Sequence, residues 1–385
     1  MPLLKQYEIA PAVPDSFAWD AQTLSARPTW HLRIEDKTID GFRHAVSSLE
    51  LDDNFFNRYA HGDIELPGLQ QLADDIRQEV QHGLGVVWLQ GFPTSSFTVT
   101  QMKFFYLLVG AAIGQTMGNY GRLYDVRDYG GSYKTERIPV SQTRAATGFH
   151  TDSSSRNTMP DIVALLCVQP ARAGGESLIV SGATVHEELR ATNMGALTIL
   201  YREFIRDIVT PGAGKTLDAL INNRFPVFSQ GLYSLGLSFR YMRYWMEKGH
   251  REASMDLTQA DIDALNTLDH FLESPRLAAR FKLDAGDQLW VNNHIVAHNR
   301  TASARAGGRK YLVYTLTAGQ LLLLAIVWIH SLVPGGEFQA GGMLPPGTPN
   351  WTTTALFILF VVGIGVKAGI MPLHGWLPAA MVCPT

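Results

Sequence analysis

Cysteine is scarce in this sequence, with only Cys167 and Cys383 among 385 residues. Two cysteines cannot build the disulfide framework of a small secreted scaffold, nor a cysteine-based zinc site. The first residues also lack the basic start and the long apolar core of a secretory signal. We therefore expect a domain that is neither secreted nor disulfide-stabilised, with a cytoplasmic location.

A strong excess of charge of one sign is also missing. The formal net charge is −3 and the pI is about 6.5, so no overall basic field recruits nucleic acid. Hydrophobic residues make up 46% of the chain, which is enough to form a core and excludes a disordered protein. A small-molecule substrate is the partner we expect, and nucleic acid is not.

Charge is almost absent from residues 319–385, where only Glu337 and Lys367 are charged. Two apolar runs, 312–333 and 353–371, approach the length of about 20 residues that a helix needs to cross a bilayer. We predict a soluble domain over residues 1–317. The remaining residues, 318–385, form a hydrophobic tail with two membrane-type helices and possible membrane association. A pair of buried core helices is the alternative.

The body of the chain alternates helix-like and strand-like segments. Apolar residues at helical spacing, with capping residues before them, predict helices. Short runs rich in β-branched residues between Gly and Pro predict strands. The predicted helices span 68–81, 96–114 and 256–274, the last with Thr258 or Asp256 as N-cap; the predicted strands span 86–92, 162–169, 177–182, 287–303 and, as the last strand, 309–316.

A histidine followed two residues later by a carboxylate occurs at 61–63, 150–152 and 186–188, among other positions. On a strand, two such side chains point to the same face and can share a metal. The first instance lies in a polar turn and the third at the start of a predicted helix, where residues two apart do not share a face. Only His150 and Asp152 precede strong strand signals, so we select them as metal ligands.

A second histidine would complete a two-histidine, one-carboxylate triad, which leaves three positions open on a non-haem Fe(II). The segment after Asp287 offers His294 and His298. Because they are four residues apart, a strand places both on one face, and parity does not choose between them.

Four motifs together resemble the taurine-dioxygenase-like (TauD/TfdA-type) branch of the Fe(II)/2-oxoglutarate dioxygenases. They are HTD at 150–152, GGES at 174–177, NNHIVAHNRT at 292–301 and GGRKYL at 307–312. The resemblance covers about residues 15–316. It implies a double-stranded β-helix fold and coupling of 2-oxoglutarate decarboxylation to oxidation of a substrate C–H bond. The cofactor would be Fe(II), with 2-oxoglutarate and O2 as cosubstrates.

The resemblance also implies the site residues. In the family, Asn-x-x-x-x-His-x-Arg-Thr carries the distal iron ligand, and the match selects His298. The hydroxyl of Ser177 would bond 2-oxoglutarate, and Arg309, eleven residues after the distal histidine, would pair with its far carboxylate. Arginine suits that role because its guanidinium is planar, always charged and bidentate. Arg300 would help to orient the cosubstrate.

One departure concerns the substrate. Family members that act on sulfonates or aryloxy acids have a second arginine four residues after the first, and here that position is Val313. A substrate anion held at that position is therefore not expected. Arg127 and Arg144, which precede the HTD motif, are substrate candidates, with solvated surface arginines as the alternative.

The tail resembles a different family. GIGVKAGIMPLHGWLPAAMVCPT is similar to the antiporter-like membrane subunits of NADH-quinone oxidoreductase, with Lys367 and His374 at matching positions. An intramembrane lysine is costly and by default functional, but it needs partner helices to conduct protons. We interpret the chain as a nearly complete dioxygenase joined to a fragment of an unrelated membrane subunit.

The sequence thus predicts an α+β protein with a jelly-roll core, flanking helices and a C-terminal apolar helical hairpin. The predicted iron ligands are His150, Asp152 and His298. The alternatives are a fragment of a proton-translocating membrane subunit and a jelly-roll binding module without catalysis. Stoichiometric iron uptake would distinguish the last alternative from an enzyme.

Overall fold

The structure of the chain is a computed structural model in which part of the sequence is described. For residues 303–304 and 308–319 only the backbone is described. The chain divides into two compact units, of which the first holds every element from α1 to β12 except β4 and the second holds β4, β13, α11 and α12. The described residues are 7–10, 13, 15–49, 51, 64–117, 123–126, 148–171, 173–209, 214–231, 236–301, 303–304, 308–333 and 344–368.

The larger sheet of the first unit has four strands in the order β1-β2-β11-β3. The first two strands are parallel, and the other neighbours are antiparallel. Valine, leucine and tryptophan dominate β2 and β11, as expected for strands that are buried on both faces. The bounds are β1 (His31–Arg33), β2 (Val86–Gln90), β11 (Gln288–Asn292) and β3 (Ile162–Leu166).

A second sheet has the order β10-β5-β12 and is antiparallel. The chain moves between the two sheets from β3 to β5 and again from β10 through β11 to β12. Such alternation is typical of the double-stranded β-helix that the sequence predicts. The bounds are β10 (Ala279–Phe281), β5 (Ser177–Ser181) and β12 (Val296–Arg300), and two short antiparallel pairs are formed by β6 (Phe204–Ile205) with β7 (Arg224–Phe225) and β8 (Phe228–Ser229) with β9 (Ser238–Phe239).

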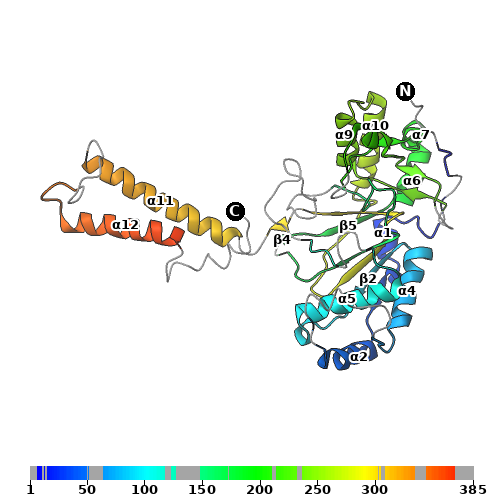
Figure 1. The fold of residues 1–385 in the computed structure, drawn as a ribbon, viewed down its shortest axis with the longest axis horizontal. Helices are drawn as coiled ribbons and strands as arrows, with labels where there is room; N and C mark the ends of the chain where they lie inside the picture. The colour runs from blue at the N-terminus through cyan, green and yellow to red at the C-terminus, as the bar shows by residue number, and fades with distance from the viewer. Residues whose placement is uncertain are drawn as a thin grey trace. The chain divides into compact units, whose positions relative to one another are not determined.

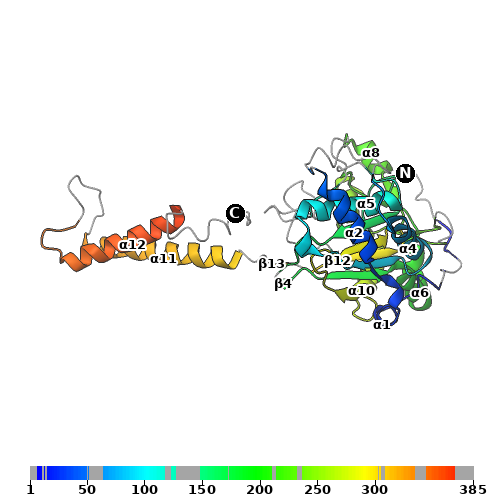
Figure 2. The ribbon, with the colours of Figure 1, turned by 90° about the horizontal axis from the view of Figure 1, so that it is seen from below.

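Three helices cover one face of the larger sheet: α2 (Asp36–Ser47), α4 (Leu69–His82) and α5 (Val99–Ile113). Figure 1 shows them on the side of β2, and Figure 2 shows the three helices next to one another. Successive side chains of a strand point to opposite faces, so alternate residues of β2 face the helices. Two of them, Val87 and Leu89, pack in one apolar cluster with side chains of the three helices.

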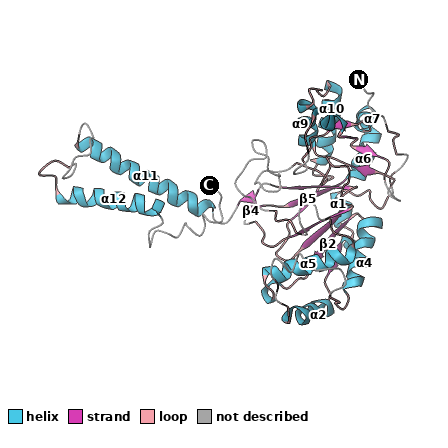
Figure 3. Cartoon of the chain, in the orientation of Figure 1, coloured by secondary structure: helices cyan, strands magenta, loops and turns pink. Residues whose placement is uncertain are grey.

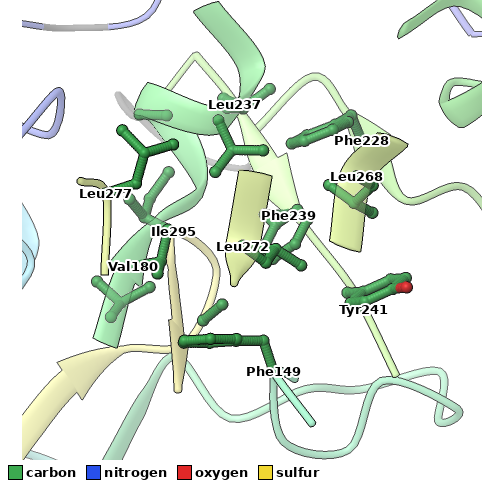
Figure 4. Packing of buried hydrophobic residues seen from close by; sticks show 14 of the residues in the cluster. Phe149, Val180, Phe228, Leu237, Phe239, Tyr241, Leu268, Leu272, Leu277 and Ile295 are labelled. Atoms are coloured by element: carbon green, nitrogen blue, oxygen red, sulfur yellow. The ribbon is translucent and has the colours of Figure 1, made fainter. Parts of the chain in front are cut away.

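Most of the other helices of the first unit contribute apolar side chains to a larger core. This cluster takes apolar side chains from both sheets, for example Val86 of β2 and Ile179 of β5, and therefore joins the sheets into one body. Figure 4 shows part of it, with Phe149, Val180 and Ile295 beside helix residues such as Leu272. The bounds are α1 (Ala21–Ser25), α6 (Gly182–Thr192), α7 (Met194–Leu200), α8 (Leu217–Asn222), α9 (Arg243–Glu252), α10 (Gln259–Leu272) and the 3-10 turns Pro28–Trp30 and Thr94–Ser96.

The helices predicted in the body are confirmed as α4, α5 and α10, and the mixture of helices and strands in Figure 3 confirms the α+β class. The Thr258 side chain, one of two N-cap candidates, accepts a hydrogen bond from the backbone N–H of Asp261, whose carboxylate bonds back to the backbone N–H of Thr258. This capping box satisfies two N–H groups that the first turn leaves without a partner.

The second unit contains a two-residue strand pair and two long helices. The pair is antiparallel and joins β4 (Ala173–Gly174) to β13 (Ser303–Ala304). The helices α11 (Gly308–Leu332) and α12 (Asn350–Ala368) pack against each other, with the Trp328 and Trp351 rings 6.0 Å apart between centroids.

Two expectations about this region need correction. The segment 309–316, predicted as the last strand, is the first part of α11, so Arg309 lies on a helix rather than at the head of a strand. A helix satisfies its hydrogen bonds within the segment, whereas a strand needs a neighbour. Among the described residues, no helix combines the length and the apolar character that crossing a bilayer requires. The two membrane-type helices predicted for residues 318–385 are therefore not supported.

Candidate metal centre

His150 and His298 lie directly opposite each other in an isolated antiparallel bridge. The His150 N–H donates to the His298 carbonyl at 3.0 Å, and the His298 N–H donates back at 2.9 Å. Residues opposite each other in such a pair place their side chains on the same face. The two imidazole rings consequently lie 4.4 Å apart between centroids, at an interplanar angle of 54°.

Asp152 completes a compact set of ligand atoms. Its Oδ1 lies 3.6 Å from Nε2 of His150 and 3.7 Å from Nε2 of His298. One ligand atom from each of the three residues lies within 4.8 Å of the other two. The histidine side chains are 17% and 13% exposed and the Asp152 side chain is 45% exposed, so the set is open on the side of the carboxylate. Two imidazoles and a carboxylate in one cluster suit a divalent transition metal such as Fe(II).

The His150 ring is oriented by the backbone. Its Nδ1 lies 3.0 Å from the carbonyl oxygen of Gly148 and donates to it, which leaves the lone pair of Nε2 directed at Asp152. Metal-binding histidines commonly use the second nitrogen in this way. The Nδ1 of His298 is buried without a hydrogen-bond partner among the described residues.

The protonation states favour metal binding. Burial and the neighbouring His298 lower the pKa of His150 to about 4, so its imidazole is neutral at pH 7. Burial raises the pKa of the Asp152 carboxyl, but its contacts with His298 and His150 outweigh burial and hold the pKa at about 2. The His150 ring nitrogen and the ionised Asp152 carboxylate are therefore ready to bind a cation.

Asn293 is a supporting residue whose role the sequence did not reveal. It is fully buried, and its Oδ1 accepts the backbone N–H of Asp152 at 2.8 Å. Its Nδ2 donates to the Asp152 carbonyl at 3.0 Å and to the Pro160 carbonyl at 3.1 Å. The motif that contains Asn293 was visible in the sequence. Its contact with Asp152 could not be predicted from local patterns, because the two residues are 141 positions apart.

The structure distinguishes His294 from His298, which the alternation of side chains along a strand could not do. His294 lies apart from the ligand set: its Nε2 is 3.1 Å from Oδ1 of Asp161, and its Nδ1 is 3.3 Å from the Ser238 hydroxyl. His294 belongs to the turn before β12, not to the strand, so the same-face argument does not apply to it. His298 is the histidine that meets His150.

The His-x-acid motif at 186–188 does not join the set. His186 is a core residue, with Nδ1 2.9 Å from the Glu187 carboxylate and Nε2 2.9 Å from the Tyr201 hydroxyl. The motif at 61–63 lies outside the described residues.

The predicted cosubstrate residues are placed only in part. Ser177 on β5 lies opposite Arg300 on β12, two positions along from the pair formed by Ile179 and His298. Because side chains alternate along a strand, Ser177, Arg300 and His298 share one face of the sheet. Arg309 is in the first turn of α11, in the second unit, where only its backbone is described. The substrate candidates Arg127 and Arg144 lie outside the described residues.

Sequence comparison adds two family matches. The family described as "Taurine catabolism dioxygenase TauD, TfdA family" matches residues 52–315. The family described as "NADH:quinone oxidoreductase/Mrp antiporter, TM" matches residues 292–385. The two matches overlap over the segment that contains β12 and the start of α11.

Individual relatives match over part of their length. FR-33289 synthase of Streptomyces rubellomurinus is 26% identical over 230 residues, which are 58% of this chain and 65% of the relative. Uridine-5'-phosphate dioxygenase of a Streptomyces species is 30% identical over 169 residues, 42% of this chain and 57% of the relative. The chain thus spans less than two thirds of both. A crystal structure of asparagine oxygenase, 16% identical, superposes with a TM-score of 0.51 over 72% of this chain and 89% of that one, which supports the fold.

Proposed function

Since the chain belongs to the TauD, TfdA family of dioxygenases, we propose that it is a non-haem Fe(II)/2-oxoglutarate-dependent oxygenase. It would couple decarboxylation of 2-oxoglutarate to succinate with oxidation of a C–H bond in a small molecule. This class of reaction is supported by the relative named uridine-5'-phosphate dioxygenase and by the asparagine oxygenase structure, which is a complex with Fe(II) and succinate.

A single observation carries the proposal: the ligand atoms of His150, Asp152 and His298 converge within 4.8 Å. These three residues would hold Fe(II) and leave room on the metal for 2-oxoglutarate and for oxygen. When bound, the metal supplies the activation of O2 that no amino-acid side chain provides. The three side chains fit Fe(II), because two imidazoles and a carboxylate lie together in one cluster that is open to solvent.

The residues of the chain hold and orient what binds there. The Gly148 carbonyl fixes the His150 ring, and Asn293 fixes the backbone on both sides of Asp152. We propose that Ser177 and Arg300 contact 2-oxoglutarate, because they lie on the His298 face of the sheet. We also propose that Arg309 pairs with the carboxylate of 2-oxoglutarate that lies far from the metal. This proposal is supported only by the spacing of Arg309 from His298 in the sequence.

The test is spectroscopic and uses the full chain under anaerobic conditions. Fe(II) is added first and 2-oxoglutarate second, and the visible charge-transfer band of the chelate is recorded. We expect His298→Ala to lose the band. In Arg309→Ala the band should still form, but the apparent affinity for 2-oxoglutarate should be at least tenfold lower. His294→Ala is the matched control, because this histidine lies in the same segment but bonds Asp161 and Ser238.

The outcomes separate the proposal from its alternative. A band that His298→Ala abolishes and His294→Ala keeps supports the oxygenase. A folded chain that takes up no iron would instead support a jelly-roll binding module without catalysis. Succinate release from 2-oxoglutarate under air provides a second readout.

We propose no transport activity for the tail. Its match to the antiporter family covers residues 292–385, and Lys367 lies outside the parts of the chain whose side chains are described. A cytoplasmic location of the oxygenase unit and membrane association of 318–385 stay expectations, which fractionation of cells that express the chain would test.

A further inference from the structure

Arg206 is a cation buried without a counter-charge. It follows β6, and its residue is 0% exposed. Its Nη2 donates to the carbonyl of Arg240 at 2.8 Å and to that of Pro226 at 3.2 Å. Its Nε and Nη1 are buried and have no hydrogen-bond partner among the described residues. Buried polar groups are normally satisfied, so these N–H groups point to a missing acceptor.

A second arginine, Arg240, is half-buried, and its backbone carbonyl accepts the hydrogen bond from Arg206. The Arg240 side chain stacks on the Phe225 ring, 4.0 Å from its centroid, and its Nη1 donates to the Arg156 carbonyl at 3.0 Å. In the described part of the chain, no carboxylate forms an ion pair with either arginine. Burial and the charge of Arg240 lower the pKa of Arg206, as expected for neighbouring cations that lack an anion between them.

Asp207, which follows Arg206 in the sequence, does not neutralise the two arginines, because it already forms ion pairs with lysines. Asp207 is buried, and its carboxylate pairs with Lys215 and with Lys248, the latter at 2.9 Å. Lys215 also pairs with Glu252. Asp207 and Glu252 are therefore neutralised by lysines, and no carboxylate among the described residues compensates the positive charge of the arginine pair.

The arginine pair adjoins the loop that begins at Asp152. The Asn223 side-chain amide donates to the Ser155 carbonyl at 3.1 Å and to the Arg206 carbonyl at 2.8 Å, so it ties the two segments together. The hydroxyl of Ser155 is buried and also has no partner among the described residues. Arg240 is half-buried, which leaves a side that a ligand can reach.

We propose that Arg206, Arg240 and Ser155 form a binding site for an oxyanion, a carboxylate or a phosphate, and that the anionic group of the substrate occupies it. The second step rests on the proposed function. A carboxylate or phosphate has the acceptor oxygens that the unpartnered N–H and O–H groups need, and arginine binds such groups with charge-assisted hydrogen bonds. The site holds an anion without Arg309 or the family's second arginine, in whose place Val313 stands.

The test measures anion binding without metal, so that it does not depend on the iron site. The metal-free full chain is titrated calorimetrically with inorganic phosphate and, separately, with acetate. We expect saturable binding of at least one anion with one site per chain. Arg240→Gln should weaken it by about tenfold or more, and Ser155→Ala by about fivefold, as for the loss of one hydrogen bond.

The matched control is Arg202→Gln, because Arg202 lies close by in sequence but pairs with Asp261. Its anion affinity should stay within twofold of the parent chain. Arg206→Gln is a weaker test, since it also removes the bonds to two carbonyls and endangers folding. A folded parent chain that binds neither anion, or binding that Arg240→Gln leaves unchanged, would overturn the site.

A further arm distinguishes the two sources of the anion. Phosphate that stays bound in a one-to-one ratio through dialysis would identify a permanent structural ion and overturn the assignment to the substrate. Phosphate that exchanges freely leaves the site available to the substrate and supports the assignment. Loss of the iron and 2-oxoglutarate band with anion binding intact would count against the proposed function alone.

Discussion

The side-chain amide of Asn293 holds the backbone of Asp152 on both sides, accepting its N–H at 2.8 Å and donating to its carbonyl at 3.0 Å. Asp152 lies in a turn, where ladder hydrogen bonds do not fix the backbone. A neighbouring residue, Ser153, has φ +56°, a left-handed conformation that few residues adopt. Asn293 thus replaces the missing ladder and sets the position of the carboxylate between the two histidines.

Asn293→Ala should weaken both the fold and the metal site. It leaves the Asp152 N–H and two carbonyls without a partner, at a cost of about 2–4 kcal/mol in the free energy of unfolding. Fe(II) affinity should fall about 10- to 100-fold, as for other residues that support metal ligands. Urea denaturation and metal titration measure the two effects.

The neighbouring Asn292 provides the matched control. It is also buried, but its Nδ2 donates to the Val80 carbonyl, away from Asp152. Asn292→Ala should lose similar stability and keep its Fe(II) affinity. Equal losses of iron affinity in both variants would contradict a positioning role for Asn293.

Metal binding itself should stabilise the protein. Mn(II), which resists air oxidation, is the convenient probe, and a free concentration of 100 times its Kd should add about 2.7 kcal/mol to the free energy of unfolding. Asp152→Ala should abolish the gain in melting temperature. Asp161→Ala, which removes the carboxylate beside His294, should keep it. A gain that survives in Asp152→Ala would place the metal elsewhere.

Gly182 allows a close approach that no larger residue permits. It begins α6, and its N–H donates to the Ile295 carbonyl at 2.7 Å, just before the strand that carries His298. A Cβ there would lie 2.8 Å from the Ile295 oxygen and 2.9 Å from the Phe239 ring. Gly182→Ala should therefore destabilise the protein by about 1–3 kcal/mol, because the core must shift.

Gly195 in α7 is the control for this substitution. The nearest atom to a Cβ at that position is 3.6 Å away, which is ordinary contact. Gly195→Ala should be neutral or stabilising by up to about 1 kcal/mol, since alanine favours helices. Thermal denaturation of both variants decides, and equal melting temperatures would refute the steric argument.

The fold should lose stability in mild acid. Burial lowers the pKa of His186, of His250 and of His294 below the ordinary value of 6.5. Between the folded and the unfolded pKa, the unfolded chain binds more protons, so stability is full above about pH 6.5 and falls as the pH decreases below it. Each such proton contributes up to about 1.4 kcal/mol per pH unit.

His186→Gln tests this account through the slope rather than the absolute stability. Urea midpoints of the metal-free chain between pH 8 and pH 5 should fall less steeply in this variant than in the parent. His82→Gln, at an exposed helix end, should keep the parent slope. A parent chain whose stability is constant over this range would contradict the prediction.

Local patterns were sufficient for much of the fold. The helices α4, α5 and α10 and the strands β2, β3 and β5 follow from periodicity and capping residues, because both act within a few positions along the chain. The segment 309–316 shows the limit of such patterns. Its β-branched and aromatic residues suggested a strand, but whether a strand forms depends on a partner that the segment does not encode.

The same division applies to the site. The sequence by itself determined the HTD motif, its priority over two similar motifs, two candidate histidines four residues apart and, through the resemblance to the family motif, the choice of His298. Only the tertiary structure decided that His298 meets His150 across a bridge, that His294 bonds Asp161, and that Asn293 holds Asp152. It also brought together Arg206 and Arg240, 34 residues apart. Ligand geometry and charge compensation act through space, and contacts between distant segments exist only once the strands and turns are packed.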